Sequence, residues 1–257
     1  MIHPSAIVHP NANIAKNADI GPYCVLGEHV TIGARAALLA HVVVTGRTSI
    51  GEDTVIHPFA TIGGPSQDRK ALEGEISHTT IGARTVIREY VSIHRGSADA
   101  GGLTSVGDDC LILAYAHVAH NCRVGNNVTM SNLAQLAGHV VVEDHALISA
   151  MAGVHQFVRI GRYSFVGGYS KLGRDLPPYF LCDGNPPEVY GLNLVGLRRA
   201  GFARESLTEL KEAYKTIYQS DKNVSQAVTA LRETVRTEEG RTLLAFLEAG
   251  SERGILK

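Results

Sequence analysis

Residues 106–173 have the sequence VGDDCLILAYAHVAHNCRVGNNVTMSNLAQLAGHVVVEDHALISAMAGVHQFVRIGRYSFVGGYSKLG. Every sixth residue of this stretch is apolar over twelve consecutive positions: Val106, Ile112, Val118, Val124, Met130, Leu136, Val142, Ile148, Val154, Ile160, Val166 and Leu172. Several of these residues are followed directly by glycine, whose backbone accepts tight corners. A period of six over this length is typical of a hexapeptide-repeat parallel β-helix, in which three hexads form one triangular coil.

The same period already runs through the N-terminal part of the chain, from Ile2 to Ile62. It fails between residues 64 and 80, resumes at Ile81, and fails again over residues 95–105. Long interruptions of a repeat tend to leave one face of the solenoid and to build its binding surface. We therefore predict a mainly β fold, with a parallel β-helix over residues 1–178 and loops near 64–80 and 95–105.

The repeat ends at Pro177-Pro178, and we expect an irregular connector around the turn residues 183–187. Apolar residues then recur at spacings of three and four, which predicts helices ending near Tyr218, over 224–235 and over 238–250. Residues 179–257 are thus expected to form a connector and a small C-terminal α-helical domain. A domain of this size is expected to pack on the β-helix or on a neighbouring subunit.

Composition excludes several classes of protein. The net charge of −1 gives no sign of the excess of basic residues that nucleic-acid binding requires. The four cysteines have no paired metal spacing and are expected to be reduced thiols of a cytosolic protein. No apolar run is long enough to cross a membrane, and the N-terminus does not resemble a signal peptide. We therefore expect a cytoplasmic protein without stable membrane insertion.

In such a fold, residues 18 apart lie one above the other, with about 4.8 Å between neighbouring coils. Three of these columns gather imidazoles, an amide and a glycine at one edge, and His117 precedes them on the lowest coil. The columns are His120, Gly138 and Gln156; Asn121, His139 and Phe157; and Ala119, Ala137 and His155. This patch is the candidate chemical centre.

Clustered imidazoles suit general-base catalysis of acyl transfer. An imidazole such as that of His120 can take a proton from an attacking hydroxyl at neutral pH. The backbone N–H of Gly138 can then stabilise the oxyanion formed from a thioester donor. Two alternatives stay open: a zinc site, although His117 and His120 lack the spacing of known zinc-binding β-helix hydratases, and a thiol mechanism through Cys122.

The chain also resembles a known family in seven segments: IHRG at 93–96, AHVAHN at 116–121, LAGHV at 136–140, VHQF at 154–157, DLPPY at 175–179, DGNP at 183–186 and GLRRAGF at 196–202. These segments are similar to those of bacterial UDP-N-acetylglucosamine acyltransferases of lipid A biosynthesis. The resemblance implies a left-handed β-helix and a homotrimer with active sites between subunits. It implies transfer of a 3-hydroxyacyl chain from acyl carrier protein to the 3-position of UDP-N-acetylglucosamine, the first step of that pathway, without a cofactor or acyl-enzyme.

The resemblance also implies roles for individual residues. His120 matches the general base and Gly138 the oxyanion donor. The positions that line the cleft are His94, His117, His139, His155 and Gln156. The other substrate positions are Gln67, Asp68 and Lys70 in a loop that contacts sugar and phosphate, Asn193 and Arg199 on the nucleotide side, and Gly168, which limits the acyl chain. Glycine at position 168 leaves room, so we expect a long acyl chain.

Two positions depart from the family pattern: Asn121 stands where relatives often have Asp, and Ala200 where they often have a second Arg. The first departure leaves open a weaker base, another group in the role of the Asp, or an Asp role that is dispensable. The second leaves open a weaker diphosphate contact or a 3-amino UDP-sugar acceptor that would give an amide. A non-catalytic scaffold is a further alternative. A related N-acyltransferase would carry an extra N-terminal domain. Carrier protein is acidic, so basic residues near the cleft are expected to dock it: Arg159, Arg162, Lys171, Arg174, Arg198 and Arg199.

Overall fold

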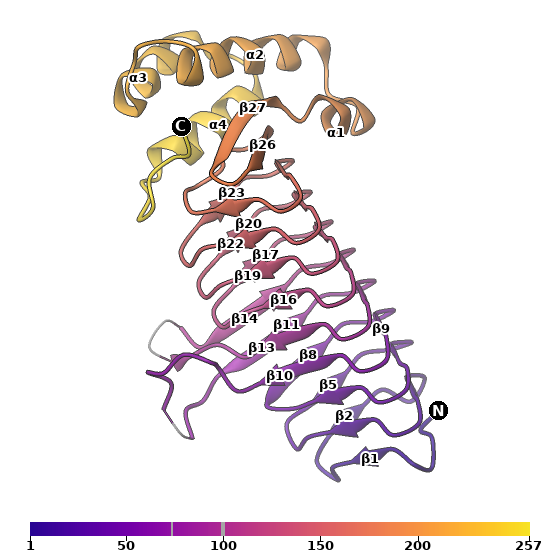
Figure 1. Ribbon diagram of the computed structural model, residues 1–257. Coiled ribbons are helices and arrows are strands. Elements are labelled where there is room, and N and C mark those ends of the chain that lie inside the picture. The colour runs from indigo at the N-terminus through magenta and orange to yellow at the C-terminus, as the bar shows by residue number, and fades with distance from the viewer. Residues whose placement is uncertain (73, 99–100) are drawn as a thin grey trace.

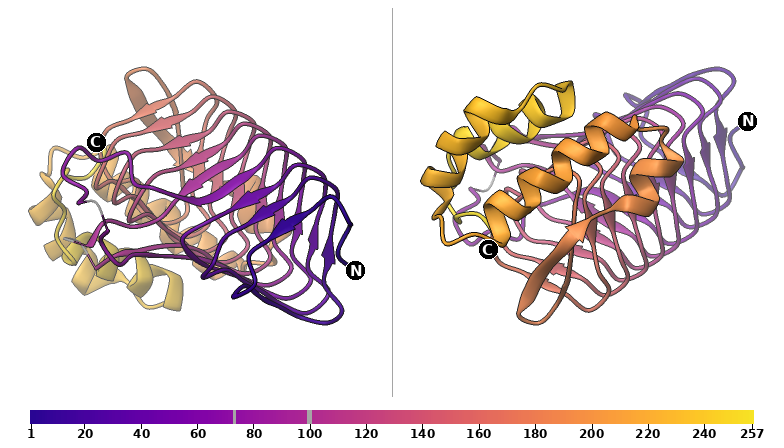
Figure 2. Two further views of the ribbon diagram at one scale, coloured as in Figure 1. Left: turned by 90° about the horizontal axis from the view of Figure 1, so that it is seen from below. Right: turned by 90° about the horizontal axis from the view of Figure 1, so that it is seen from above.

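The computed structural model describes residues 1–72, 74–98 and 101–257. Short parallel strands follow one another around a triangular coil, and the coils stack from the N-terminus towards a cap of helices (Figure 1). Figure 2 shows the same stack from below and from above. The β-helix predicted from the period of six is confirmed.

Three parallel sheets form the faces of the triangle. The first sheet contains β1 Ile7–Val8, β4 Val25–Leu26, β7 Val43–Val44, β10 Thr61–Gly64, β13 Ser92–His94, β16 His117–Val118, β19 Gln135–Leu136, β22 Gly153–Val154 and β25 Lys171–Leu172. The second contains β2 Asn13–Ile14, β5 Thr31–Ile32, β8 Arg47–Ile50, β11 His78–Ile81, β14 Leu103–Val106, β17 Arg123–Val124, β20 Val141–Val142 and β23 Arg159–Ile160. The third contains β3 Asp19–Ile20, β6 Ala37–Leu38, β9 Val55–Ile56, β12 Val86–Ile87, β15 Leu111–Ile112, β18 Thr129–Met130, β21 Leu147–Ile148, β24 Phe165–Val166, β26 Phe180–Gly184 and β27 Pro187–Leu192.

The core is the interior of the coils. Strands pair with the strand one coil away, so that Val118 lies beside Leu136 and Leu136 beside Val154. The residues at the sixth positions point inward, and those from Ile20 to Leu172 are all nearly inaccessible to solvent. Side chains at the neighbouring positions of the same strands point outward, since successive strand residues face opposite sides. The first sheet therefore presents His117 and Gln135 on its outer surface.

The segment expected to be an irregular connector is instead a pair of strands. Strand β26 pairs parallel with β24, and β27 returns antiparallel to β26. Leu176 and Cys182 are fully buried and continue the interior columns of Ile160 and Val166, at a spacing of 16 residues instead of 18. Because the corner after Leu172 is two residues shorter, the strict period of six misses this last coil.

Four helices cover the C-terminal end of the β-helix (Figure 1). They are α1 Leu194–Arg199, α2 Arg204–Tyr218, α3 Val224–Thr234 and α4 Glu238–Glu248. The three longer helices confirm the predicted ones. The N-cap residues of α3 and α4 are Asn223 and Thr237, and their side chains accept hydrogen bonds from backbone N–H groups of the first helical turn. Among the described residues, no helix has the length and apolarity to span a membrane.

Both interruptions of the repeat leave the β-helix on the same side, at the edge where the first sheet passes to the second (Figure 1). The first loop joins β10 to β11, and the second joins β13 to β14. They meet where the backbone N–H of Ala98 donates to the Glu75 carboxylate at 3.2 Å. The loops therefore form one wall beside the candidate centre.

Candidate active site

The candidate centre lies at the corner between the first and second sheets. The N–H of His139 donates to the His120 carbonyl at 3.1 Å, and the N–H of Phe157 donates to the Gly138 carbonyl at 3.2 Å. His120 thus lies one coil away from Gly138, as the 18-residue column predicts. A Cβ atom at position 138 would lie 2.6 Å from both Cε1 and Nε2 of His120. Only glycine leaves space for the imidazole.

Asn121 orients the His120 ring. Its Oδ1 accepts from the backbone N–H of Ser97 at 2.9 Å and from Ser97 Oγ at 2.8 Å, and its Nδ2 donates to the Ser97 carbonyl at 3.1 Å. Since a backbone N–H can only donate, these bonds decide which atom of the amide is the oxygen. His120 Nδ1 lies 2.9 Å from that oxygen and must therefore carry a proton. In the neutral ring, the lone pair is then on Nε2, which lies on the side of Gly138.

The network shows which functions of an aspartate Asn121 can take over at this position. Asn121 is 6 % exposed, and its backbone N–H donates to Thr104 Oγ1 at 2.8 Å, so the corner is anchored to both the second loop and β14. The amide oxygen can orient the imidazole. It lacks the negative charge with which an aspartate would stabilise the imidazolium form.

A second pair of imidazoles lies beside the first. His117 Nδ1 is 2.7 Å from Ser92 Oγ, and the His94 ring meets the His117 ring edge to face at 5.0 Å. Burial, assisted by His94, lowers the pKa of His117 to about 4, and burial likewise lowers the pKa of His94. Both rings are therefore neutral at physiological pH. Within the part of the chain that the structure describes, the buried His94 Nδ1 has no hydrogen-bond partner.

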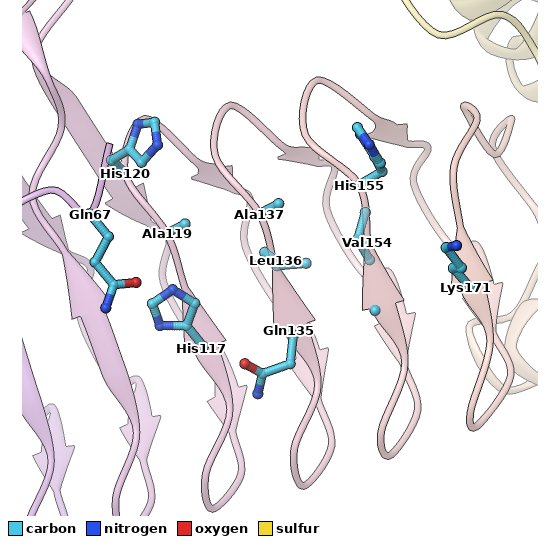
Figure 3. Close-up of a pocket in the computed structure, with 11 residues that line it drawn as sticks. Gln67, His117, Ala119, His120, Gln135, Leu136, Ala137, Val154, His155 and Lys171 are labelled. Carbon is cyan, nitrogen blue, oxygen red and sulfur yellow. The ribbon is translucent and has the colours of Figure 1, made fainter. Parts of the chain in front are cut away.

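A groove of about 480 Å³ runs along the outer surface of the first sheet (Figure 3). Four of the predicted residues line it: Gln67, His117, His120 and His155. Its floor is apolar, and its other lining residues are Ala119, Gln135, Leu136, Ala137, Gly153, Val154 and Lys171. Gln135, Gly153 and Lys171 follow His117 at intervals of 18, which is the signal that could have identified Gln135 from the sequence.

The first loop brings polar groups to the end of the groove beside His120. Gln67 lines the groove itself. Asp68 accepts the backbone N–H of Lys70 at 3.0 Å, and this bond is the main cause that lowers the pKa of the Asp68 carboxyl. The other groups that act electrostatically on this carboxyl are His120, Lys70 and His139, so Asp68 lies near both rings. The predicted loop residues and the predicted base are therefore neighbours.

Two predicted residues lie around the corner from the groove. The His139 ring meets the His120 ring edge to face at 5.1 Å and stacks on Phe157 at 4.5 Å. His139 faces a second hollow of about 410 Å³, between the β-helix and the C-terminal tail. The backbone carbonyl of Gln156 accepts a bond from the Arg253 side chain in the same tail.

Three further predicted residues lie away from the groove within this chain. Gly168 is at the other edge of the first sheet, where a Cβ atom would lie 3.3 Å from the Ala150 carbonyl. The Asn193 side chain caps α1 through Gly196 and donates to the Tyr163 carbonyl at 3.0 Å. Arg199 is exposed in the last turn of α1.

One sequence-based idea is wrong. The Cys122 side chain points into the core, donates to the Ala137 carbonyl at 3.1 Å, and has its pKa raised to about 12 by burial, so it cannot supply a thiolate to the groove. Among the residues expected to dock a carrier protein, Arg159 forms an ion pair at 2.7 Å with the fully buried Asp175. Among the described residues, no three His, Cys, Asp or Glu side chains are grouped to hold a metal ion.

Comparison with known proteins first defines the class. A model described as the bacterial transferase hexapeptide (six repeats) matches residues 1–34 and 104–138. A second, described as UDP-N-acetylglucosamine O-acyltransferase, domain 2, matches residues 175–256. The chain is therefore a hexapeptide-repeat transferase with a left-handed β-helix and a helical C-terminal region.

The particular family follows from close relatives. The chain is 46 % identical over 255 residues to acyl-[acyl-carrier-protein]–UDP-N-acetylglucosamine O-acyltransferase of Rhizobium etli, covering 99 % of this chain and 93 % of the relative. It is 45 % identical over 213 residues to the protein of that name from Burkholderia orbicola, covering 81 % and 80 %. The structure of LpxA from Acinetobacter baumannii superposes with a TM-score of 0.97 at 40 % identity, covering 100 % and 99 %. The chain belongs to the UDP-N-acetylglucosamine O-acyltransferase family.

Proposed function

We propose that this chain transfers a 3-hydroxyacyl group from acyl carrier protein to the 3-hydroxyl of UDP-N-acetylglucosamine, the first step of lipid A biosynthesis. The observation that carries the proposal is the His120 imidazole over Gly138, with its tautomer set by Asn121, at the end of a groove with an apolar floor. The relatives are named O-acyltransferases, which favours an oxygen acceptor over the 3-amino sugar. An enzyme is favoured over a non-catalytic or metal-binding scaffold for the same reason.

The chemistry needs only the chain's own groups. His120 Nε2 takes the proton of the sugar 3-hydroxyl as its oxygen attacks the thioester carbonyl. The N–H of Gly138 donates no hydrogen bond within the described residues and is free to bind the developing oxyanion. The tetrahedral intermediate collapses and the carbon–sulfur bond breaks. The leaving thiolate then takes from His120 the proton that came from the sugar hydroxyl. No acyl-enzyme forms.

We assign the two ends of the groove to different substrates. The polar first loop, with Gln67, Asp68 and Lys70, suits the sugar and phosphates of the acceptor, and His94, His117 and His139 suit the ring and amide around the reacting hydroxyl. The floor of Leu136, Ala137 and Val154 suits an acyl chain. Gly168 adds no side chain at the edge of the first sheet, which supports a long acyl chain.

We also propose a cytoplasmic homotrimer with a site between each pair of subunits. Along the corner between the third and first sheets runs an exposed row of apolar side chains, which is unfavourable in water unless another surface covers it. The row comprises Tyr23, Phe59, Tyr90, Tyr115, Leu133, Met151 and Tyr169. A neighbouring copy would give the open groove a second wall and could contribute Asn193 and Arg199, which lie away from the groove in their own chain.

The test is acyl transfer from 3-hydroxyacyl carrier proteins of several chain lengths to UDP-N-acetylglucosamine, with wild type beside His120→Ala. We expect the variant to lose about 100-fold or more in kcat, the contribution of a general base. A variant close to wild type would remove His120 from this role. A wild type that accepts only the 3-amino sugar would overturn the proposed acceptor.

A further inference from the structure

The C-terminal tail returns from α4 to the β-helix and is anchored there. The N–H of Asp175 donates to the Gly254 carbonyl at 2.9 Å, and the N–H of Leu256 donates to the Asp175 carbonyl at 2.9 Å. Ile255 and Leu256 are buried. These contacts hold Arg253, the residue before Gly254, against the coil that bears His155 and Gln156.

Arg253 grips this coil with two donors of its guanidinium group. Nε donates to the Gln156 carbonyl at 2.8 Å, and Nη2 contacts His155 Nδ1 while lying 3.3 Å from His155 Nε2. His155 and Gln156 are exposed, and no other side chain within the described residues bonds the His155 ring. Without Arg253, the hydrogen-bonding contact left to this ring among the described residues is that of Nδ1 with the Gln156 carbonyl at 3.3 Å, so the ring would change rotamer more easily.

The contact also selects one form of the imidazole. A guanidinium has donors only, so the bond from Arg253 requires Nδ1 of His155 to accept and favours the ring proton on Nε2. The Gln156 carbonyl, 3.3 Å from the same Nδ1, favours the other tautomer, and the closer guanidinium contact outweighs it. Because the guanidinium is planar and rigid, it can reach a ring nitrogen and a carbonyl together, which a lysine ammonium on its flexible stem does less well.

We propose that Arg253 is a positioning residue for acyl transfer, which acts through His155 on the acyl chain of the donor. His155 lines the groove beyond Ala137 and Val154, two coils from His120, where an acyl chain that starts at the reacting carbonyl would pass. By fixing the His155 ring, Arg253 keeps this part of the side wall in place. The proposal rests on the proposed function, because it assigns the groove floor to the acyl donor.

The test compares long and short donors. Arg253→Met should lower kcat/KM about tenfold for a 3-hydroxymyristoyl carrier protein, as expected for losing one charge-assisted hydrogen bond. It should change kcat/KM little for a 3-hydroxybutyryl donor, whose chain ends before His155, and leave KM for UDP-N-acetylglucosamine unchanged. Arg253→Lys should retain part of the activity. The matched control is Arg232→Met, which removes an exposed arginine of α3 paired with Glu248 of α4 at 2.6 Å and should leave kcat/KM unchanged for both donors.

A double-mutant cycle separates positioning from simple anchoring of the tail. If Arg253 acts through His155, Arg253→Met has no further effect in a His155→Ala background. Additive losses, or equal losses with the short donor, would overturn the proposal. Nitrogen chemical shifts of His155 give a readout that does not need turnover: wild type should show the Nε2–H tautomer and Arg253→Met a mixture. Any other form in wild type also contradicts the proposal, whereas an inactive wild type with this tautomer tells against the proposed function only.

Discussion

Two corners of the same β-helix use polar residues in different ways. At the corner between the second and third sheets, Asp108 accepts the N–H of Ala83, Asn126 that of Asp108, and Asp144 that of Asn126, each at 2.8 Å. The same bond recurs from coil to coil. A glycine precedes each of the three donating residues and makes room for the accepting side chain one coil further on, as at Gly125, where a Cβ atom would lie 2.4 Å from Asp144 Oδ1.

At the corner between the first and second sheets, no side-chain hydrogen bond recurs from coil to coil among the described residues. His120 bonds Asn121, which bonds the second loop, and His155 bonds the tail. Gly138 also makes room for a side chain one coil away, but that side chain is an imidazole that faces the groove. Polar residues that repeat with the coil serve the backbone, whereas those that break the repeat are the candidates for chemistry.

The largest expected difference between the corners comes from matched glycine substitutions. Gly138→Ala should lower kcat about 100-fold, because a new Cβ atom displaces the His120 ring and small misplacements of a catalytic group are costly. Gly125→Ala, which crowds Asp144 equally, should lower the melting temperature and leave kcat unchanged. Steady-state kinetics and thermal unfolding of both variants test this. Equal losses of kcat would mean that the two corners do not differ in function.

The second largest difference in kcat is expected between substitutions of two asparagines, one at each corner. Asn121→Ala should lower kcat on the order of tenfold to 100-fold, a part of what a well-oriented general base contributes. Asn126→Ala removes only the bond from the Asp108 N–H and should leave kcat unchanged. Asn121→Asp keeps the acceptor for His120 and adds a charge that stabilises the imidazolium, so its kcat should equal or exceed that of wild type. An Asn121→Ala enzyme with normal kcat would show that His120 needs no orienting partner.

The smallest expected effect is the contribution of His117 to the pH dependence of stability. Burial lowers the pKa of His117 to about 4 from 6.5, so the unfolded chain takes up a proton between these values that the folded chain does not. Stability is therefore lost as the pH falls through this window. His117→Gln should show a smaller drop in melting temperature between about pH 7 and about pH 5 than wild type. An equal drop in both proteins would mean that His117 is not buried in its neutral form.

Periodic features could be predicted from the sequence. The interior residues, the column of His120 and Gly138 and the three longer helices follow from spacings of six, 18, and three or four. Features without a period could not. The last coil does not follow from the period because its corner is two residues shorter. The inward direction of Cys122 is readable from spacing, since Val140 and Val158, 18 and 36 residues further on, are apolar and buried, but the thiol alternative compares it only with His120.

The amino-acid sequence is enough to predict the stack of coils, because a strand alternates its side chains and a coil of 18 residues repeats them in register. It is also enough to predict which imidazoles share an edge. How these imidazoles are held depends on the folded chain: Ser97 reaches Asn121 from an inserted loop, and Arg253 reaches His155 from a tail about a hundred residues away. Neither loop nor tail obeys a repeat, so their partners depend on packing between segments that are distant in sequence.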